Sequence, residues 1–206
     1  MPLIHKFYYN HAKIGIWHIT EALDFFENDY KPLKKISHPK NKLLHAAAWY
    51  TAINIAKPLI ILPNYLPSGA PTDVNNNYYL SLSHTNIYAA AALHTLKNIG
   101  VDIEQLNSKA IIIKNKFANA LDISSLDTLN LNNEVHKFSL LWSIKEAAFK
   151  CMQLHGINFK STMSLIAIEQ INLLAFNFKL AWNNITLSGT AKKIGDIWVA
   201  CIIKPL

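Results

Sequence analysis

The chain has 206 residues, of which 51% are hydrophobic and 16% charged, and its formal net charge at pH 7 is +7. This composition is ordinary for a folded protein of one domain or two closely packed halves, and it argues against disorder. No apolar run approaches the roughly 18 residues of a membrane span, and the first ten residues, MPLIHKFYYN, lack the basic start and apolar middle of a signal peptide. We therefore expect a monomer in the cytoplasm with no membrane partner.

The positive charge favours an anionic partner such as a polyphosphate ligand or an acidic protein. The chain contains no arginine, the side chain on which nucleic-acid-binding proteins rely most for bases and phosphates. A magnesium-dependent nuclease or nucleic-acid binder is therefore a minor alternative, and we expect no nucleic-acid partner. The two cysteines, Cys151 and Cys201, lack metal-binding or redox spacing and are expected to be buried free thiols.

Hydrophobic periodicity predicts the elements of the first half, in chain order: a strand at 13–19, a short helix at 20–28, a helix at 41–56, a loop at 63–77, a strand at 78–84 and a strand at 87–96. Thr20 is a plausible cap of the short helix, and Pro39 and Pro58 bracket the longer one. The segment 87–96 is rich in alanine, but its length and neighbours favour a strand, which we expect to pair with the strand at 100–106.

The second half is expected to contain a helix at 108–120, a long helix at about 133–155 that ends at Gly156, and strands near 162–169, 174–181, 184–190 and 196–203. Each half would then combine a helix with antiparallel strands, which is an α+β arrangement. We place the division between residues 1–98 and 99–206. No linker separates the two segments, so we expect one compact unit.

The segment GVDIE, residues 100–104, carries two carboxylates. In a strand, Val101 and Ile103 can enter the core while Asp102 and Glu104 project together from the other face. Carboxylates two residues apart lie roughly 6 to 7 Å apart along a strand, close enough to approach one hard cation. The alternative is an exposed strand face that carries two charges.

The segment LLWSIKEAAFK, residues 140–150, places Glu146 on the same helix face as Trp142 and Phe149. A carboxylate on a packed face needs compensation. Lys150, four residues on, could supply it as a surface ion pair. Alternatively, Glu146 meets the two strand carboxylates around Mg²⁺, in which case Lys145 and Lys150 would flank a phosphate.

The segment LSLSHTNIYAA, residues 80–90, adds Ser81, Ser83 and His84 near the end of a strand. A lone histidine is more often structural than catalytic, and no GxSxG motif accompanies the serines. The chain also lacks a Walker loop, a GxGxxG motif and an HExxH motif. The common nucleoside-triphosphatase, dinucleotide-binding and zinc-protease classes therefore have no support.

Taken in order, LSLSHT (80–85), GVDIE (100–104) and WSIKEAAFK (142–150) resemble the signature of the 4′-phosphopantetheinyl transferase superfamily, in residue type and in spacing. The length is similar to that of the surfactin-synthetase-activating type, in which two similar α+β halves form a pseudodimer within one chain and the active site lies between them. The resemblance implies transfer of 4′-phosphopantetheine from coenzyme A to a serine of an apo acyl or peptidyl carrier protein, with release of adenosine 3′,5′-bisphosphate.

Carried over by position, the resemblance implies Asp102, Glu104 and Glu146 as the Mg²⁺ ligands, and Ser83, His84, Lys145, Lys150, Lys40 and Lys42 as the residues that bind coenzyme A. Glu146, Lys150 and His84 are the expected catalytic residues. Glu146 would help to remove the serine proton, and Lys150 would stabilise or protonate the leaving phosphate. The carrier protein would present an acidic face that complements the net charge.

Three positions depart from the family pattern. Asn41 stands near the place of a common arginine, Ala70 stands in place of a lysine in a Gly-Lys-Pro loop, and Leu121 occupies the place of a common glutamate, with Asp122 one step later. The first two changes concern the nucleotide end of coenzyme A. A degenerate member that binds coenzyme A or a carrier protein without transfer is therefore the alternative function.

Overall fold

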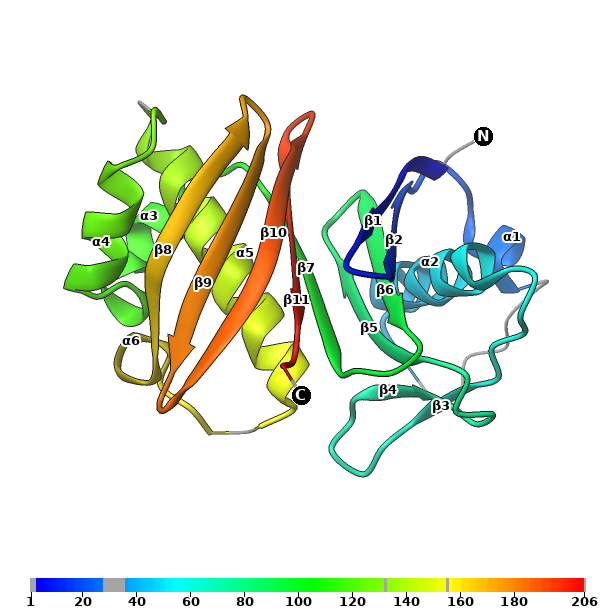
Figure 1. Ribbon diagram of the computed structural model, residues 1–206. Helices are drawn as coiled ribbons and strands as arrows, with labels where there is room; N and C mark the ends of the chain where they lie inside the picture. Colours follow the sequence, from blue (N-terminus) through cyan, green and yellow to red (C-terminus); the bar gives the residue numbers. More distant parts are fainter. Residues whose placement is uncertain (1–2, 28–35, 132, 155, 206) are drawn as a thin grey trace.

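The computed structural model describes residues 3–27, 36–131, 133–154 and 156–205. The helices and strands, in chain order, are β1 Leu3–Tyr9, β2 Ala12–His18, α1 Leu23–Glu27, α2 Pro39–Ala56, β3 Pro63–Tyr65, β4 Pro71–Asp73, β5 Tyr79–His84, β6 Tyr88–His94, β7 Ile99–Gln105, α3 Lys109–Phe117, α4 Ala120–Asp127, α5 Glu134–Met152, α6 Phe159–Thr162, β8 Met163–Asn172, β9 Ala175–Trp182, β10 Ile185–Ile194 and β11 Ile197–Ile203 (Figure 1). The α+β class expected from the sequence is confirmed.

The N-terminal sheet has the strand order β1-β2-β6-β5, and every neighbouring pair is antiparallel. The long helix α2 covers one face of this sheet (Figure 1). Pro39 opens α2, where the missing N–H of proline removes no intrahelical bond. The alanine-rich segment around β6 forms a strand, as predicted, because short side chains on both faces allow close packing on α2 and on the second sheet.

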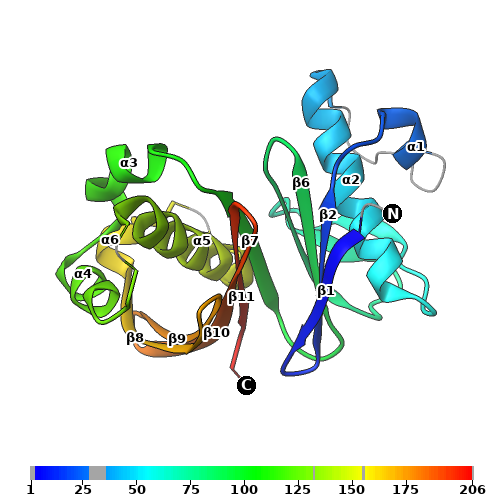
Figure 2. The ribbon, with the colours of Figure 1, turned by 90° about the horizontal axis from the view of Figure 1, so that it is seen from above.

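The C-terminal sheet has the order β7-β11-β10-β9-β8, is also antiparallel, and curves around α5 (Figure 2). The helix crosses β7 at very short range. A Cβ atom added at Gly100 would lie 1.9 Å from the Ala147 carbonyl oxygen and 2.6 Å from the Cys151 nitrogen. Glycine at this position therefore allows α5 to lie directly on the face of β7 that carries Asp102.

The two sheets pack face to face, with α2 and α5 on the outer sides (Figure 2). Small and branched apolar residues fill the interface, from β2 and β6 on one side and from β7 and β11 on the other. At one margin, β5 and β7 lie side by side without forming a strand pair. Instead, the backbone N–H groups of Val101 and Ile103 donate to Ser81 Oγ at 3.0 Å and Ser83 Oγ at 3.4 Å. Two of the three sequence motifs meet here.

Several expected elements need correction. The strand at 100–106 does not pair with β6: it forms β7, which pairs with β11. The helix expected at 108–120 forms as α3 but ends at Phe117, and an unexpected second helix, α4, follows it with Asn119 as its cap. The long helix ends at Met152, followed by Gln153 in the left-handed conformation, so Gly156 is not its cap. Thr20 does not cap α1, which begins at Leu23.

Two strands of the loop expected at 63–77, β3 and β4, form a short hairpin, and β1 was not anticipated. Cys151 and Cys201 are buried and free, as predicted. In the described part of the chain, every helix is too short or too polar to cross a membrane.

Candidate active site

A polar network joins the two halves at the margin where β5 meets β7. Lys150 Nζ lies 2.6 Å from Asp102 Oδ1 and 2.9 Å from Ser83 Oγ. The Ser83 hydroxyl donates to the same Asp102 oxygen at 2.7 Å. Asp102 is 5% exposed. Lys150 therefore pairs with a carboxylate on β7, across from its own helix, and a surface ion pair with Glu146 does not describe its environment.

Glu104 and Glu146 are half-buried beside this network. Burial, and then the negative charge of Asp102, raise the pKa of each of these carboxyl groups to about 7. Lys150 opposes the rise of the pKa at Glu146, and a hydrogen bond from Trp142 opposes it at Glu104. Three carboxyl groups from β7 and α5 thus interact electrostatically, as the strand and helix patterns predicted.

The helix face that carries Glu146 is packed, as expected. The Trp142 ring lies 4.9 Å from the ring of Phe117, and both Trp142 and Phe149 pack on Phe159, at 5.5 and 5.7 Å between ring centres. These contacts pack the helix face that carries the half-buried Glu146, and burial is the first cause of its raised pKa.

Two cavities adjoin the network. One, of about 460 Å³, is lined by residues of both halves, among them Asn41, His84, Glu104 and Trp142. The other, of about 240 Å³, is lined by the loop 68–71, by Leu80–Leu82 and by the end of α5 including Lys150. Cavities of this size suit parts of a small organic ligand.

His84 ends β5 and is exposed toward the larger cavity. Desolvation, and then the positive charge of Lys150, lower the pKa of His84, while Asp102 acts in the opposite direction. The imidazole is therefore mainly neutral at pH 7 and can either donate or accept a hydrogen bond.

A family model described as the 4′-phosphopantetheinyl transferase superfamily matches residues 98–200, which is half of the chain and contains both β7 and α5. The chain belongs to the 4′-phosphopantetheinyl transferase superfamily. Membership supports phosphopantetheinyl transfer as the general activity and implies coenzyme A and a carrier protein as substrates. A search of curated proteins found no match.

The donor chemistry of this candidate site fits a hard cation such as Mg²⁺. Asp102 Oδ2 is buried and has no hydrogen-bond partner among the described residues. Burial, and then the charge of Asp102, raise the pKa of Glu104 and of Glu146 to about 7, and a nearby cation would favour their ionised forms. The described residues nevertheless contain no group of three or more side chains already gathered for metal ligation. In this arrangement the cation in contact with Asp102 is the Lys150 ammonium.

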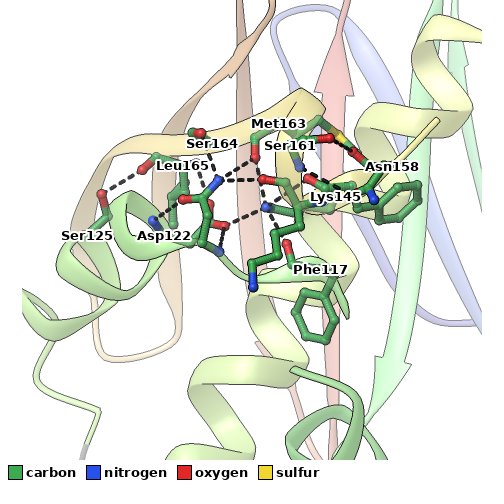
Figure 3. A network of polar contacts seen from close by, with 12 residues as sticks. Phe117, Asp122, Ser125, Lys145, Asn158, Ser161, Met163, Ser164 and Leu165 are labelled. Carbon is green, nitrogen blue, oxygen red and sulfur yellow. Dashed lines mark hydrogen bonds and ion pairs between the residues drawn. The ribbon is translucent and has the colours of Figure 1, made fainter. Parts of the chain in front are cut away.

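Lys145, the lysine next to Glu146, does not lie at this transferase site. Its side chain is fully buried, and its ammonium group contacts Asp122 Oδ2 at 2.5 Å and three backbone carbonyl groups, those of Phe117 at 2.7 Å, Met163 at 2.9 Å and Phe159 at 3.3 Å (Figure 3). With four acceptors and no exposed surface, Lys145 has no free donor for a phosphate. The expectation that it binds coenzyme A is therefore corrected.

The same network contains the acidic residue nearest to Leu121, the position at which the family commonly has a glutamate. Leu121 is 59% exposed, whereas Asp122 is fully buried and pairs with Lys145. The sequence held a signal for this carboxylate, because Asn119 and Asp122 form a capping box at the start of α4. That signal predicts a helix start and does not predict a buried ion pair.

The basic residues expected on α2 do not line either cavity. Lys40 is exposed, and the Lys42 ammonium pairs with Glu27 at 2.6 Å. Asn41 is the residue of this segment that lines the larger cavity, and Ala70 lines the smaller one. Two of the three departures from the family pattern, Asn41 and Ala70, therefore lie where a ligand would contact the protein.

Proposed function

We propose that the protein transfers 4′-phosphopantetheine from coenzyme A to a serine of an apo acyl or peptidyl carrier protein, with Mg²⁺ as cofactor. The carrier serine oxygen forms a bond to the phosphorus atom that bears the pantetheine arm. The bond from that phosphorus to the bridging oxygen breaks, and adenosine 3′,5′-bisphosphate leaves with the electron pair. The observation that carries this proposal is the junction of Asp102, Ser83 and Lys150 between the halves, with Glu104 and Glu146 beside it.

We also propose the surfactin-synthetase-activating type, with the halves 1–98 and 99–206 as an intramolecular pseudodimer. Two features support it: each half packs one long helix on an antiparallel sheet, and the two sheets face each other. The shorter family type needs several chains to build a site, whereas here residues of both halves of one chain line the larger cavity. The monomeric state and the cytoplasmic location stay predictions.

Asp102, Glu104 and Glu146 are the proposed Mg²⁺ ligands. When bound, the cation would neutralise charge on the pyrophosphate of coenzyme A. Glu146 would accept the proton of the carrier serine. Bound Mg²⁺ would favour the ionised form of Glu146, which is the form that can accept a proton.

Lys150 and His84 are the proposed phosphate-binding residues of the chain. Lys150 would turn from Asp102 toward the pyrophosphate and stabilise charge on the leaving oxygen. The neutral His84 imidazole would hydrogen-bond a phosphate oxygen from the larger cavity. Ser83 was expected to bind coenzyme A, but it is buried and its hydroxyl contacts Asp102 and Lys150, so we propose instead that it positions these two side chains.

The proposal is tested by incubating the protein with Mg²⁺, coenzyme A and a panel of apo carrier proteins, followed by mass spectrometry of each carrier. The expected result is a gain of one phosphopantetheine mass on at least one carrier, and Glu146→Gln should lower the rate at least about 100-fold. Absence of any gain across fatty-acid, polyketide and peptide carriers would contradict transfer.

The second candidate is a member that binds coenzyme A or a carrier protein without transfer. The lining of the cavities by Asn41 and Ala70, together with the pairing of Lys42 with Glu27, favours weak anchoring of the nucleotide. Calorimetry that shows coenzyme A binding in a protein without turnover would favour this candidate. Turnover with a high KM for coenzyme A would favour the transferase.

A further inference from the structure

We infer that the Asp122–Lys145 ion pair is a positioning device for the transfer residues: it fixes the rotation of α5 so that Glu146 and Lys150 face β7. This inference rests on the proposed function. It assigns a role to a lysine whose sequence position beside Glu146 would otherwise indicate a phosphate ligand. Lys145 and Asp122 act through the helix and do not touch the substrate.

The ion pair binds α5 to much of the C-terminal half (Figure 3). Lys145 reaches the carbonyl groups at the end of α3, the start of α6 and the start of β8. Asp122 Oδ1 accepts from the Leu165 N–H at 2.7 Å, and Oδ2 accepts from the Asn119 N–H at 2.8 Å. Each charged group is therefore held by directional bonds, and α5 has one orientation that satisfies all of them.

Stability alone does not explain the pair. Both side chains are 0% exposed, and an apolar pair of similar size often stabilises a core equally well or better, because buried charges lose their hydration. Burial lowers the pKa of Lys145, and Asp122 opposes that change. Unlike apolar packing, a hydrogen-bonded ion pair forms only when its donor and acceptor atoms are correctly oriented.

Orientation matters because Glu146 is the next residue on the helix. A rotation of α5 by about 20° moves the end of a side chain by about 2 Å, since side chains end 5 to 6 Å from the helix axis. Displacement of a reacting group by about 1 Å can cost about 100-fold in rate. The helix backbone also contacts Gly100 on β7, so α5 cannot compensate by moving inward.

A second ion pair joins the same two helices and provides a matched control. Lys137 on α5 lies 2.8 Å from Asp127 on α4, but Asp127 is 64% exposed. An exposed pair of this kind contributes little and leaves no unsatisfied group when removed. The two pairs thus differ in burial while connecting the same elements.

The test compares Asp122→Asn/Lys145→Met with Asp127→Asn/Lys137→Met in the complete chain. For the first variant we expect kcat of carrier modification to fall at least about tenfold, with KM for coenzyme A within about twofold, and faster hydrogen exchange of the amides at 143–150. The control variant should match the wild type in all three measurements. Full kcat in a folded Asp122→Asn/Lys145→Met protein would overturn the inference.

Two further measurements cover the case in which the double variant does not fold. Asp122→Glu keeps both buried charges but moves the carboxylate by one methylene group, and it should show the same separation of kcat from KM. In the wild-type protein, the amides at 143–150 should be among the slowest to exchange, and rapid exchange there would overturn the inference. A wild-type protein that transfers nothing contradicts the proposed function, whereas transfer at an equal rate by wild type and variant contradicts the positioning role alone.

Discussion

Lys150 Nζ lies 2.6 Å from Asp102 Oδ1, so the cation in contact with this carboxylate is a lysine ammonium. The pair joins α5 to β7, and the Ser83 hydroxyl adds β5 from the other half. The second oxygen of Asp102 is buried without a partner among the described residues. If the proposed Mg²⁺ binds Asp102, Lys150 and the cation would compete for the same carboxylate.

Competition predicts that Lys150→Gln binds Mg²⁺ more tightly than the wild type in the absence of coenzyme A, by about tenfold, or about 1.4 kcal/mol. The same variant should lose transfer activity, because no ammonium is left for the leaving phosphate. Isothermal calorimetry with Mg²⁺ measures the first effect. Equal Mg²⁺ affinity in the two proteins would contradict competition at Asp102.

The carboxyl pKa values predict an unusual dependence of stability on pH. Glu146 titrates at about 7 in the folded protein and near 4.5 when unfolded, so between these values the folded state binds more protons. The free energy of unfolding contributed by this group therefore falls as pH rises from about 4.5 to about 7. Relative to the wild type, Glu146→Gln should gain on the order of 1 to 3 kcal/mol over this interval without Mg²⁺.

Urea unfolding at pH 5 and pH 7.5 measures this difference. Added Mg²⁺ should stabilise the wild type more at pH 7.5 than at pH 5, since cation and protons compete for the same oxygens. A parallel pH profile for wild type and Glu146→Gln would show that the pKa of Glu146 is not raised.

The helices and strands were largely predictable from the sequence, because hydrophobic periodicity and helix-ending or turn-forming residues such as proline and glycine act locally. The alternation in 78–84 and the helix opened by Pro39 depend on neighbouring residues alone. The partner of β7 was not predictable in this way. Strand pairing depends on residues throughout the sheet. The strand β7 does not pair with β6, which precedes it in the chain, and is instead an edge strand of the second sheet, beside β11.

The acidic residues of the site were predictable because strand and helix periods place Asp102, Glu104 and Glu146 on definite faces. The different environments of Lys145 and Lys150, two of the three lysines of α5, were not predictable in this way. Lys145 and Lys150 are both typical phosphate ligands by residue type, yet Lys145 donates to three distant carbonyl groups, whereas Lys150 pairs with Asp102 and lines the smaller cavity. Those carbonyl groups become neighbours only after the chain has folded.

The departure at Asn41 predicts a gain of function. Asn41 lines the larger cavity, and an arginine there would supply a planar, permanently charged group for a phosphate of coenzyme A. Asn41→Arg should lower KM for coenzyme A by about three- to tenfold with little change in kcat, as for an interaction formed equally in ground and transition states. Lys40→Arg, at an exposed position outside the cavity lining, is the control and should leave KM unchanged. An equal KM in Asn41→Arg would place the nucleotide elsewhere.

The contact of α5 with β7 predicts a severe effect of Gly100→Ala. The added methyl group would meet the Ala147 carbonyl oxygen at 1.9 Å and the Cys151 nitrogen at 2.6 Å, and both are backbone atoms that cannot turn aside. The helix must move outward, so we expect a loss of about 2 to 4 kcal/mol in the free energy of unfolding, together with loss of transfer as Glu146 moves away from β7.

Gly156→Ala provides the comparison for Gly100→Ala in urea unfolding and in the transfer assay. Gly156 has a positive φ of 68°, but a Cβ atom there meets nothing within 4 Å, so the cost is confined to backbone strain of about 1 to 2 kcal/mol and transfer should persist. Equal effects of the two substitutions on stability and on transfer would show that close contact between α5 and β7 is not required. A larger loss in Gly100→Ala, with transfer affected in that variant alone, would show that the contact holds Glu146 in place.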